Sequence, residues 1–379
     1  EADSGRAEFA ISRREEVRTR RPGDRANAAA LAELYIQTKK WDKARELIDA
    51  LRQEADGLGL ALLDARWHGD RGAVQPAIQV LRTYIGTLED GKAKQDAYIA
   101  FGQFLLQRGL QDQGLAALNQ AVPFQDPKVM AVDQFIGDVQ LNAGLFEQAE
   151  KSYRKVLDAG VPDPTFSIRK RLIEALNQAQ KYQEAEAVFT AMGGEADRDV
   201  ELMAQHASVV RGRGDTAKAR AILDRAIQKF PDEPMPYLRR ARLSMMDPAL
   251  AKDVMEDLAR AIQLRPGFWQ ALRTRAMIAM AEGRTDEALG DLREAVARNP
   301  GNDDLRLEYL DYLVRLGREA EAMDTADAAL TGRSNDIRMM AQFANAFARG
   351  GRWARATKYY RMPAHGGRRC SGTPGRCDR

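Results

Sequence analysis

Histidine and cysteine are scarce in this chain, and both can carry nucleophilic, acid–base or metal chemistry. The three histidines, His68, His206 and His365, are far apart in the sequence. A hydrolase or transferase needs a nucleophile, a base and a charge-stabilising group that converge, and no phosphate-binding loop, G-x-S-x-G elbow or H-E-x-x-H pair occurs here. His206 stands where a large apolar residue is expected, which indicates packing. The sequence therefore predicts that the chain is not an enzyme and has no catalytic residue.

The two cysteines, Cys370 and Cys377, both lie in the last ten residues. Six residues separate them, whereas the thiolates of a zinc knuckle are about two to four residues apart, and no second pair of ligands follows. We therefore expect no metal site, no cofactor and no disulfide in the body of the chain. A regulatory thiol pair is an alternative, although a tail without function is favoured.

A helical pattern that recurs along the chain must position any binding residues. Ala, Leu, Arg, Glu, Gln and Lys dominate, and they favour helix. A small residue returns at intervals of 33 to 37 residues, with Val254 as the one larger member of the series. The series is Ala10, Ala44, Ala77, Gly114, Ala149, Ala185, Ala219, Val254, Ala288, Ala322 and Ala356. Such a register indicates one repeated unit.

Turn and stop residues divide each unit into two helices. Glycines that can end a first helix in a left-handed conformation are Gly72, Gly109, Gly144, Gly214, Gly283, Gly317 and Gly351. Prolines that can stop a second helix are Pro22, Pro231, Pro266 and Pro300. Tyr153, Leu292 and Tyr360, four residues beyond the small position, are expected to pack. The second unit fits poorly, because Asp64 replaces an apolar residue and Pro76 requires its second helix to start no earlier than about Val74.

This pattern resembles the tetratricopeptide repeat. We expect a bacterial source. The resemblance implies an all-α solenoid, a right-handed superhelix of antiparallel helix pairs, with about ten full repeats after a leading half-repeat. We expect the half-repeat over residues 1–24 and the repeats over residues 25–363, starting near residues 25, 58, 95, 130, 166, 200, 234, 269, 303 and 337. The second helix of the last repeat is expected to end at about Arg361. Residues 364–379 are expected to form an irregular tail, disordered or non-native, and the chain to be a fragment of a longer protein.

In this family the ligand usually lies in the concave groove that the first helices line, and two groups of residues are predicted to face it. The basic group is Lys170, Arg171, Arg211, Arg239, Arg242 and Arg273, which could receive an acidic peptide or be a solvated face. The methionine group is Met235, Met245, Met246, Met277 and Met280, which could form an adaptable binding patch or fill gaps around the irregular seventh repeat. Asp304, Glu308 and Asp311 then give the next repeat an acidic inner face.

Charge and hydropathy limit the classes of partner. The formal charge is +3, from 58 basic and 55 acidic residues, which is not the one-sided charge of a typical nucleic-acid-binding or anionic-membrane-binding protein. No stretch approaches the roughly 18 consecutive apolar residues of a membrane helix. We expect a soluble chain, with the compartment open and the cytoplasm slightly favoured over the periplasm.

The leading functional hypothesis is a non-catalytic scaffold or adaptor that binds a peptide or partner protein in the groove, without nucleic acid. The alternative is a docking or regulatory arm of a larger enzyme, or of a polysaccharide or protein secretion component. End-to-end association through uncapped termini is a further possibility.

Overall fold

The computed structural model describes residues 2–54, 56–245, 247–331, 333 and 336–365, and every regular element in these ranges is a helix. The chain forms two compact units. The first unit comprises Glu1–Gly193 and Ser208–Gly214, and the second comprises Gly194–Ala207 and Asp215–Arg379. The boundary falls within one helix, so that helix contributes residues to both units.

Ten helix pairs follow a leading helix, α1 (Ala2–Arg20). The first helices of the pairs are α2 (Arg25–Gln37), α4 (Leu58–Asp70), α6 (Lys92–Gln107), α8 (Ala131–Asn142), α10 (Ser167–Gln178), α12 (Val200–Gly212), α14 (Pro234–Ser244), α16 (Trp269–Ala281), α18 (Asp303–Arg315) and α20 (Ile337–Arg349). The second helices are α3 (Trp41–Glu54), α5 (Val74–Gly86), α7 (Gln111–Ala121), α9 (Phe146–Asp158), α11 (Tyr182–Met192), α13 (Thr216–Lys229), α15 (Ala251–Leu264), α17 (Thr285–Arg298), α19 (Glu319–Leu330) and α21 (Trp353–His365).

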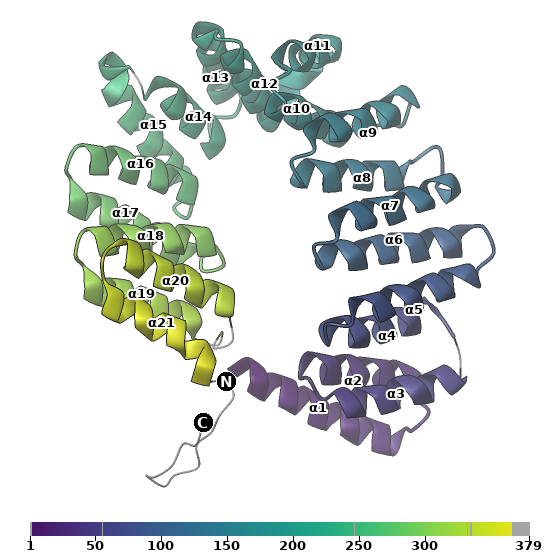
Figure 1. Cartoon of the computed structure of the whole chain (residues 1–379). Helices are drawn as coiled ribbons and strands as arrows, with labels where there is room; N and C mark the ends of the chain where they lie inside the picture. The colour runs from purple at the N-terminus through teal and green to yellow at the C-terminus, as the bar shows by residue number, and fades with distance from the viewer. Residues whose placement is uncertain (1, 55, 246, 332, 334–335, 366–379) are drawn as a thin grey trace, which may run out of the picture. The chain divides into compact units, whose positions relative to one another are not determined.

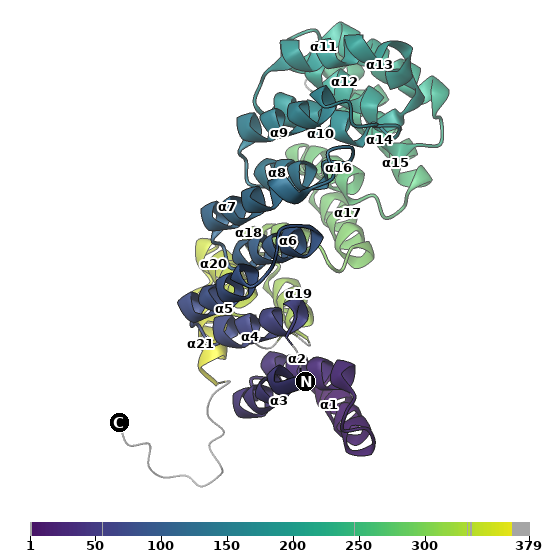
Figure 2. The ribbon, with the colours of Figure 1, turned by 90° about the vertical axis from the view of Figure 1, so that its right-hand side faces the viewer.

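Within each unit the helices stack in chain order. In the first unit, α2 to α11 succeed one another as antiparallel pairs, as both views show (Figures 1 and 2). In the second unit, each second helix from α13 to α19 contacts the first helix that follows it. Neighbouring first helices also contact each other, as α14 with α16 and α18 with α20. The all-α repeat fold predicted from the sequence is confirmed.

The turns between paired helices use the predicted left-handed residues. All seven predicted turn glycines have positive φ, between 73° and 89°. The first and fifth repeats have no glycine there, and Lys39 and Gln180 adopt φ of 58° and 59° in its place. A side chain with a Cβ pays a steric cost in this conformation. The predicted prolines also end helices, because α1, α13, α15 and α17 each stop two residues before one.

The predicted small residues lie where the two helices of a pair cross. Ala44, Ala149 and Ala288 are fully buried. A close crossing joins α6 and α7, where Gly102 and Gly114 face each other. A Cβ added to Gly102 would lie 3.1 Å from the carbonyl oxygen of Gly114 and 2.7 Å from Leu118 Cγ. The backbones therefore approach to a distance that a larger residue at the crossing would prevent.

The irregular second repeat is explained by a buried carboxylate. Asp64 is only 2% exposed and accepts hydrogen bonds from Arg45 Nη1, at 2.7 Å, and from Arg52. His68 Nε2 lies 3.8 Å from Asp64 Oδ1, and burial lowers the pKa of His68. An ion-pair network thus occupies the place of the missing apolar residue, since a buried carboxylate needs such partners. Helix α5 begins at Val74, as Pro76 predicted.

The last repeat differs from its prediction in two respects. Tyr360 is 50% exposed, whereas Tyr359 is fully buried and stacks on Phe347 with 5.5 Å between ring centroids. The prediction that Tyr360 packs was wrong, because Tyr359 faces α20 and no first helix follows α21 in the described chain. Helix α21 also continues to His365 rather than ending near Arg361. The tail residues Cys370 and Cys377 lie outside the described residues.

The helix crossing can be tested at Ala288, which is fully buried in α17. The variant Ala288→Trp would overpack the crossing with α16, and we expect a loss of about 3 kcal/mol in the free energy of unfolding. Ala297→Trp makes the same change at an exposed position of the same helix and should be close to neutral. Chemical denaturation measures both, and equal stability of the two variants would contradict the proposed register.

The left-handed turn of the fifth repeat provides a second test. Gln180→Gly removes the Cβ that is strained at positive φ, and we expect a gain of about 0.5–1 kcal/mol in the free energy of unfolding. The matched control Gln183→Gly changes an exposed residue in the first turn of α11, and it should lose rather than gain stability because glycine is a poor helix former. Thermal unfolding distinguishes the two, and a loss of stability in both variants would show that this turn is unstrained.

Candidate functional site

The predicted basic group is divided between the two units. Lys170 and Arg171 lie on α10 and Arg211 on the part of α12 that belongs to the first unit. Arg239 and Arg242 lie on α14 and Arg273 on α16, in the second unit. A single basic floor across all six residues therefore stays a prediction, and each unit has to be considered separately.

Several basic side chains of this group bridge neighbouring first helices. Arg171 Nε on α10 lies 3.6 Å from Asp138 Oδ1 on α8. In the second unit, Arg242 Nε donates to Thr274 Oγ1 at 3.1 Å, and Arg273 Nε donates to Glu308 Oε2 at 2.6 Å. Lys170 and Arg239 also interact within the chain. These contacts align adjacent first helices and partly neutralise the predicted basic surface.

The methionine group is mainly packed. Met235 and Met245 are partly buried against the core between α14 and α15, and Met280 is partly buried against the core that continues through α17 to α21. Met277 is 43% exposed. Met246 lies outside the described residues. Of the two interpretations, partial burial favours gap filling for Met235, Met245 and Met280, and Met277 is the exposed one among the four described members of the group.

The acidic inner face of the ninth repeat is also largely paired. Glu308 accepts from Arg273, and Asp311 forms ion pairs with Arg315, at 2.7 Å, and with Arg349, at 3.0 Å. Asp304 differs from its neighbours, because within the described ranges it has no ion-pair partner.

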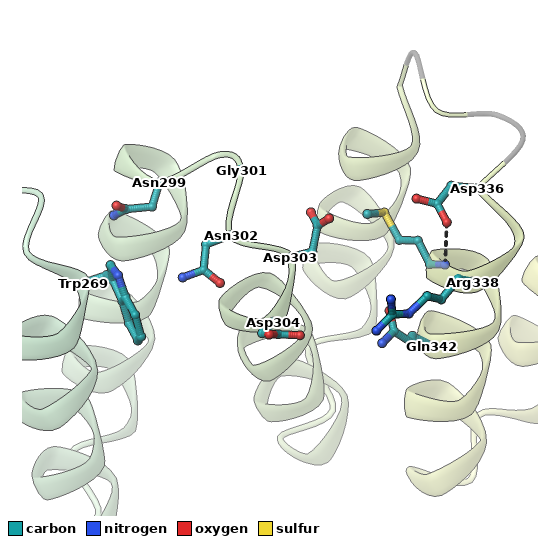
Figure 3. Close-up of a pocket in the computed structure, with 10 residues that line it drawn as sticks. Trp269, Asn299, Gly301, Asn302, Asp303, Asp304, Asp336, Arg338 and Gln342 are labelled. Atoms are coloured by element: carbon teal, nitrogen blue, oxygen red, sulfur yellow. Dashed lines mark hydrogen bonds between the residues drawn. The ribbon is translucent and has the colours of Figure 1, made fainter. Parts of the chain in front are cut away.

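Asp304 lines a pocket of about 650 Å³ at the start of three successive first helices, α16, α18 and α20. Figure 3 shows Trp269 at one side, Asn302 and Asp304 between, and Arg338 with Gln342 at the other side. The lining residues are Trp269, Asn299, Gly301, Asn302, Asp303, Asp304, Asp336, Arg338, Met339 and Gln342. All of them belong to the second unit.

Side-chain caps fix the walls of this pocket. Asn302 Oδ1 accepts from the backbone amide of Leu305 at 3.0 Å, and Asp336 Oδ1 accepts from that of Met339 at 2.9 Å. These are N-caps, which satisfy amides that lack partners in the first turn of a helix. Asn299 Nδ2 donates to the carbonyl oxygens of Gly267, at 3.1 Å, and Ala295, at 2.8 Å. The polar groups of these residues are thus used in holding the pocket together.

The charged residues of the pocket fall into two kinds. Asp303 is held by Arg306 Nη1, at 2.6 Å, and by Arg333 Nη1, at 2.9 Å. Asp304 and Arg338 have no ion pair or hydrogen bond among the described side chains. Arg338 also lies in the first turn of α20, where the helix dipole disfavours a cation. Helix stability therefore does not account for this arginine.

The sequence pointed to Asp304 but not to the rest of this pocket. Trp269, Arg338 and Gln342 carry no motif, and they meet only because the first helices stack. A usable signal was the cap positions: Asn302 and Asp336 are separated by one repeat length and mark the starts of two neighbouring first helices.

The described helices contain no segment long and apolar enough to cross a membrane. Among the described residues, no group of three or more His, Cys, Asp and Glu side chains could hold a metal ion.

Individual relatives resemble the chain at low identity. The rat DnaJ homolog subfamily C member 3 is 29% identical over 141 residues, which is 35% of this chain and 28% of that protein. A tetratricopeptide repeat protein from Parabacteroides merdae is 17% identical, with a TM-score of 0.48 over 67% of this chain and 98% of its own. A human IFIT1 dimer with PPP-AAAA is 13% identical, with a TM-score of 0.40 over 94% of both chains.

Three family models, each described as a tetratricopeptide repeat, match most of the sequence. They cover residues 1–66, residues 136–197 with 205–267, and residues 241–368. The matched models describe repeats rather than a catalytic domain. Together with the helix pairs that recur through both units, they show that the chain belongs to the tetratricopeptide repeat family.

Proposed function

We propose that this chain is a non-catalytic scaffold that binds an extended segment of a partner protein in the pocket formed by α16, α18 and α20. Repeats of this family indicate a protein-interaction scaffold. The basic group Lys170, Arg171, Arg211, Arg239, Arg242 and Arg273, together with Met277, stays part of the proposal as flanking surface on the first helices of each unit.

The observation that carries the proposal is the composition of the pocket. It offers the ring of Trp269, the carboxylate of Asp304 and the guanidinium of Arg338 on three successive first helices, whereas the other charged or amide residues of the lining, except Gln342, are already bonded within the chain: Asn299, Asn302, Asp303 and Asp336. A protein ligand supplies side chains of all three complementary kinds from one continuous segment. A small ion or cofactor would use only part of such a lining.

The dimensions also suit an extended peptide. Packed helices lie about 8–10 Å apart, and an extended chain advances about 3.3–3.6 Å per residue. About three ligand residues would therefore pass each first helix, and a segment of about seven to nine residues would cross all three. Backbone groups of such a segment could bond to polar side chains such as Gln342.

A blocking variant tests the proposal. We would select peptides from a random dodecapeptide library on the full chain and measure their dissociation constants by fluorescence anisotropy. Gln342→Trp fills the pocket from α20. We expect it to raise the dissociation constants of the selected peptides about tenfold or more, equivalent to about 1.4 kcal/mol.

Gln263→Trp is the matched control, because it makes the same change at an exposed position of the second helix α15. Both variants are first checked for unchanged helicity and thermal stability. Peptides that bind Gln342→Trp as tightly as the unchanged chain, or a library that yields no binder, would overturn the proposal.

A further inference from the structure

We infer that the segment bound in this pocket carries a basic and an acidic residue two or three positions apart, with the basic residue on Asp304 and the acidic residue on Arg338. This inference rests on the proposed function and adds the chemistry of the ligand to it.

The first argument is the pairing of the surrounding charges. In the described part of the second unit, the charged neighbours of the pocket all have ion-pair partners: Arg273, Asp303, Arg306, Glu308, Asp311 and Arg333. Of the four charged lining residues, Asp303 is ion-paired and Asp336 caps α20 through Oδ1, which leaves Asp304 and Arg338 without an ion pair or hydrogen bond among the described side chains. A ligand that meets both therefore gains two charge pairs without breaking one within the chain.

The second argument is the register of the two side chains. Asp304 is the second residue of α18 and Arg338 is the second residue of α20, so they occupy the same position in consecutive repeats. The two helices contact each other. Among the described residues no ion pair joins these two side chains, and an extended ligand can span the distance of about 8–10 Å between packed helices with two or three residues.

The same position carries no charge in the two preceding repeats. Gln270 occupies it in α16 and Met235 in α14. The pair of opposite charges is therefore a local feature of the last two repeats, and it gives the pocket a polarity that the general fold does not require.

Trp269 adds an apolar contact on the side of Asp304 that faces away from Arg338. It is the first residue of α16, and its partly buried ring packs on the core with one side while lining the pocket. Aromatic rings bind apolar and cationic side chains. The expected order along the ligand is thus an apolar or aromatic residue near Trp269, then the basic residue, then the acidic residue (Figure 3).

A charge exchange tests the inference. The double variant Asp304→Arg, Arg338→Asp keeps the composition of the pocket and reverses its polarity. Paired synthetic peptides contain one Lys and one Glu, two or three positions apart, in both orders relative to a fixed Trp. We expect the unchanged chain to prefer one order by about tenfold and the exchanged chain to prefer the opposite order.

The control exchange is Lys252→Glu with Glu256→Lys, an exposed ion pair of α15. It should leave the order preference unchanged. The preference of the unchanged chain should weaken at high salt, since exposed charges are screened.

The outcomes separate the two levels of the account. If the exchanged chain keeps the original order preference, or if neither chain distinguishes the orders, the inference on ligand charge is overturned. In that case the proposed function still stands if Gln342→Trp weakens the binding of the selected peptides. If Gln342→Trp does not weaken binding, the proposed function itself fails.

Discussion

The close approach of two helix backbones within each repeat is the constraint on which the rest of the structure depends. Gly102 and Gly114 show its limit, because an added Cβ on either would lie within about 3.2 Å of the carbonyl oxygen of the other. In other repeats an alanine such as Ala149 or Ala288, fully buried, fills the same place. Tight pairing fixes the direction in which the next first helix packs, and so each repeat positions its successor.

The stacking of first helices then creates surfaces that no single repeat contains. Arg242, Arg273 and Arg349 each reach a first helix other than their own, and these bonds tie the row of helices together. The carboxylates of Glu308 and Asp311 on α18 are occupied in this way. The pocket beside Trp269 is the exception, because Asp304 and Arg338 form no ion pair or hydrogen bond among the described side chains. The stacking of first helices pairs the other charges named above, and it leaves Asp304 and Arg338 available for the proposed ligand.

The sequence predicted what depends on local conformation. Turn glycines, proline stops and the small residues at helix crossings act over a few residues, and each was visible as a spacing. Side chains that depend on distant partners were not predictable in this way. Asp64 departs from the repeat pattern, and the sequence did not show that Arg45 and Arg52 pair with its carboxylate. Arg273 was correctly placed on a first helix, but its partner Glu308 is 35 residues away. Tyr359 is buried in place of the predicted Tyr360, because one residue of helix rotation decides which ring faces the core. The division into two units, within α12, left no mark in the repeat spacing.

The measurement that tests the central claim most directly is hydrogen–deuterium exchange of the full chain, with and without a peptide selected on it. First-turn amides of a helix lack intrahelical partners and exchange readily unless something covers them. Our account predicts that bound peptide slows exchange in the first turns of α16, α18 and α20, around Trp269, Asp304 and Arg338. Slowed exchange confined to other helices, with these three first turns unchanged while the peptide is bound, would contradict it.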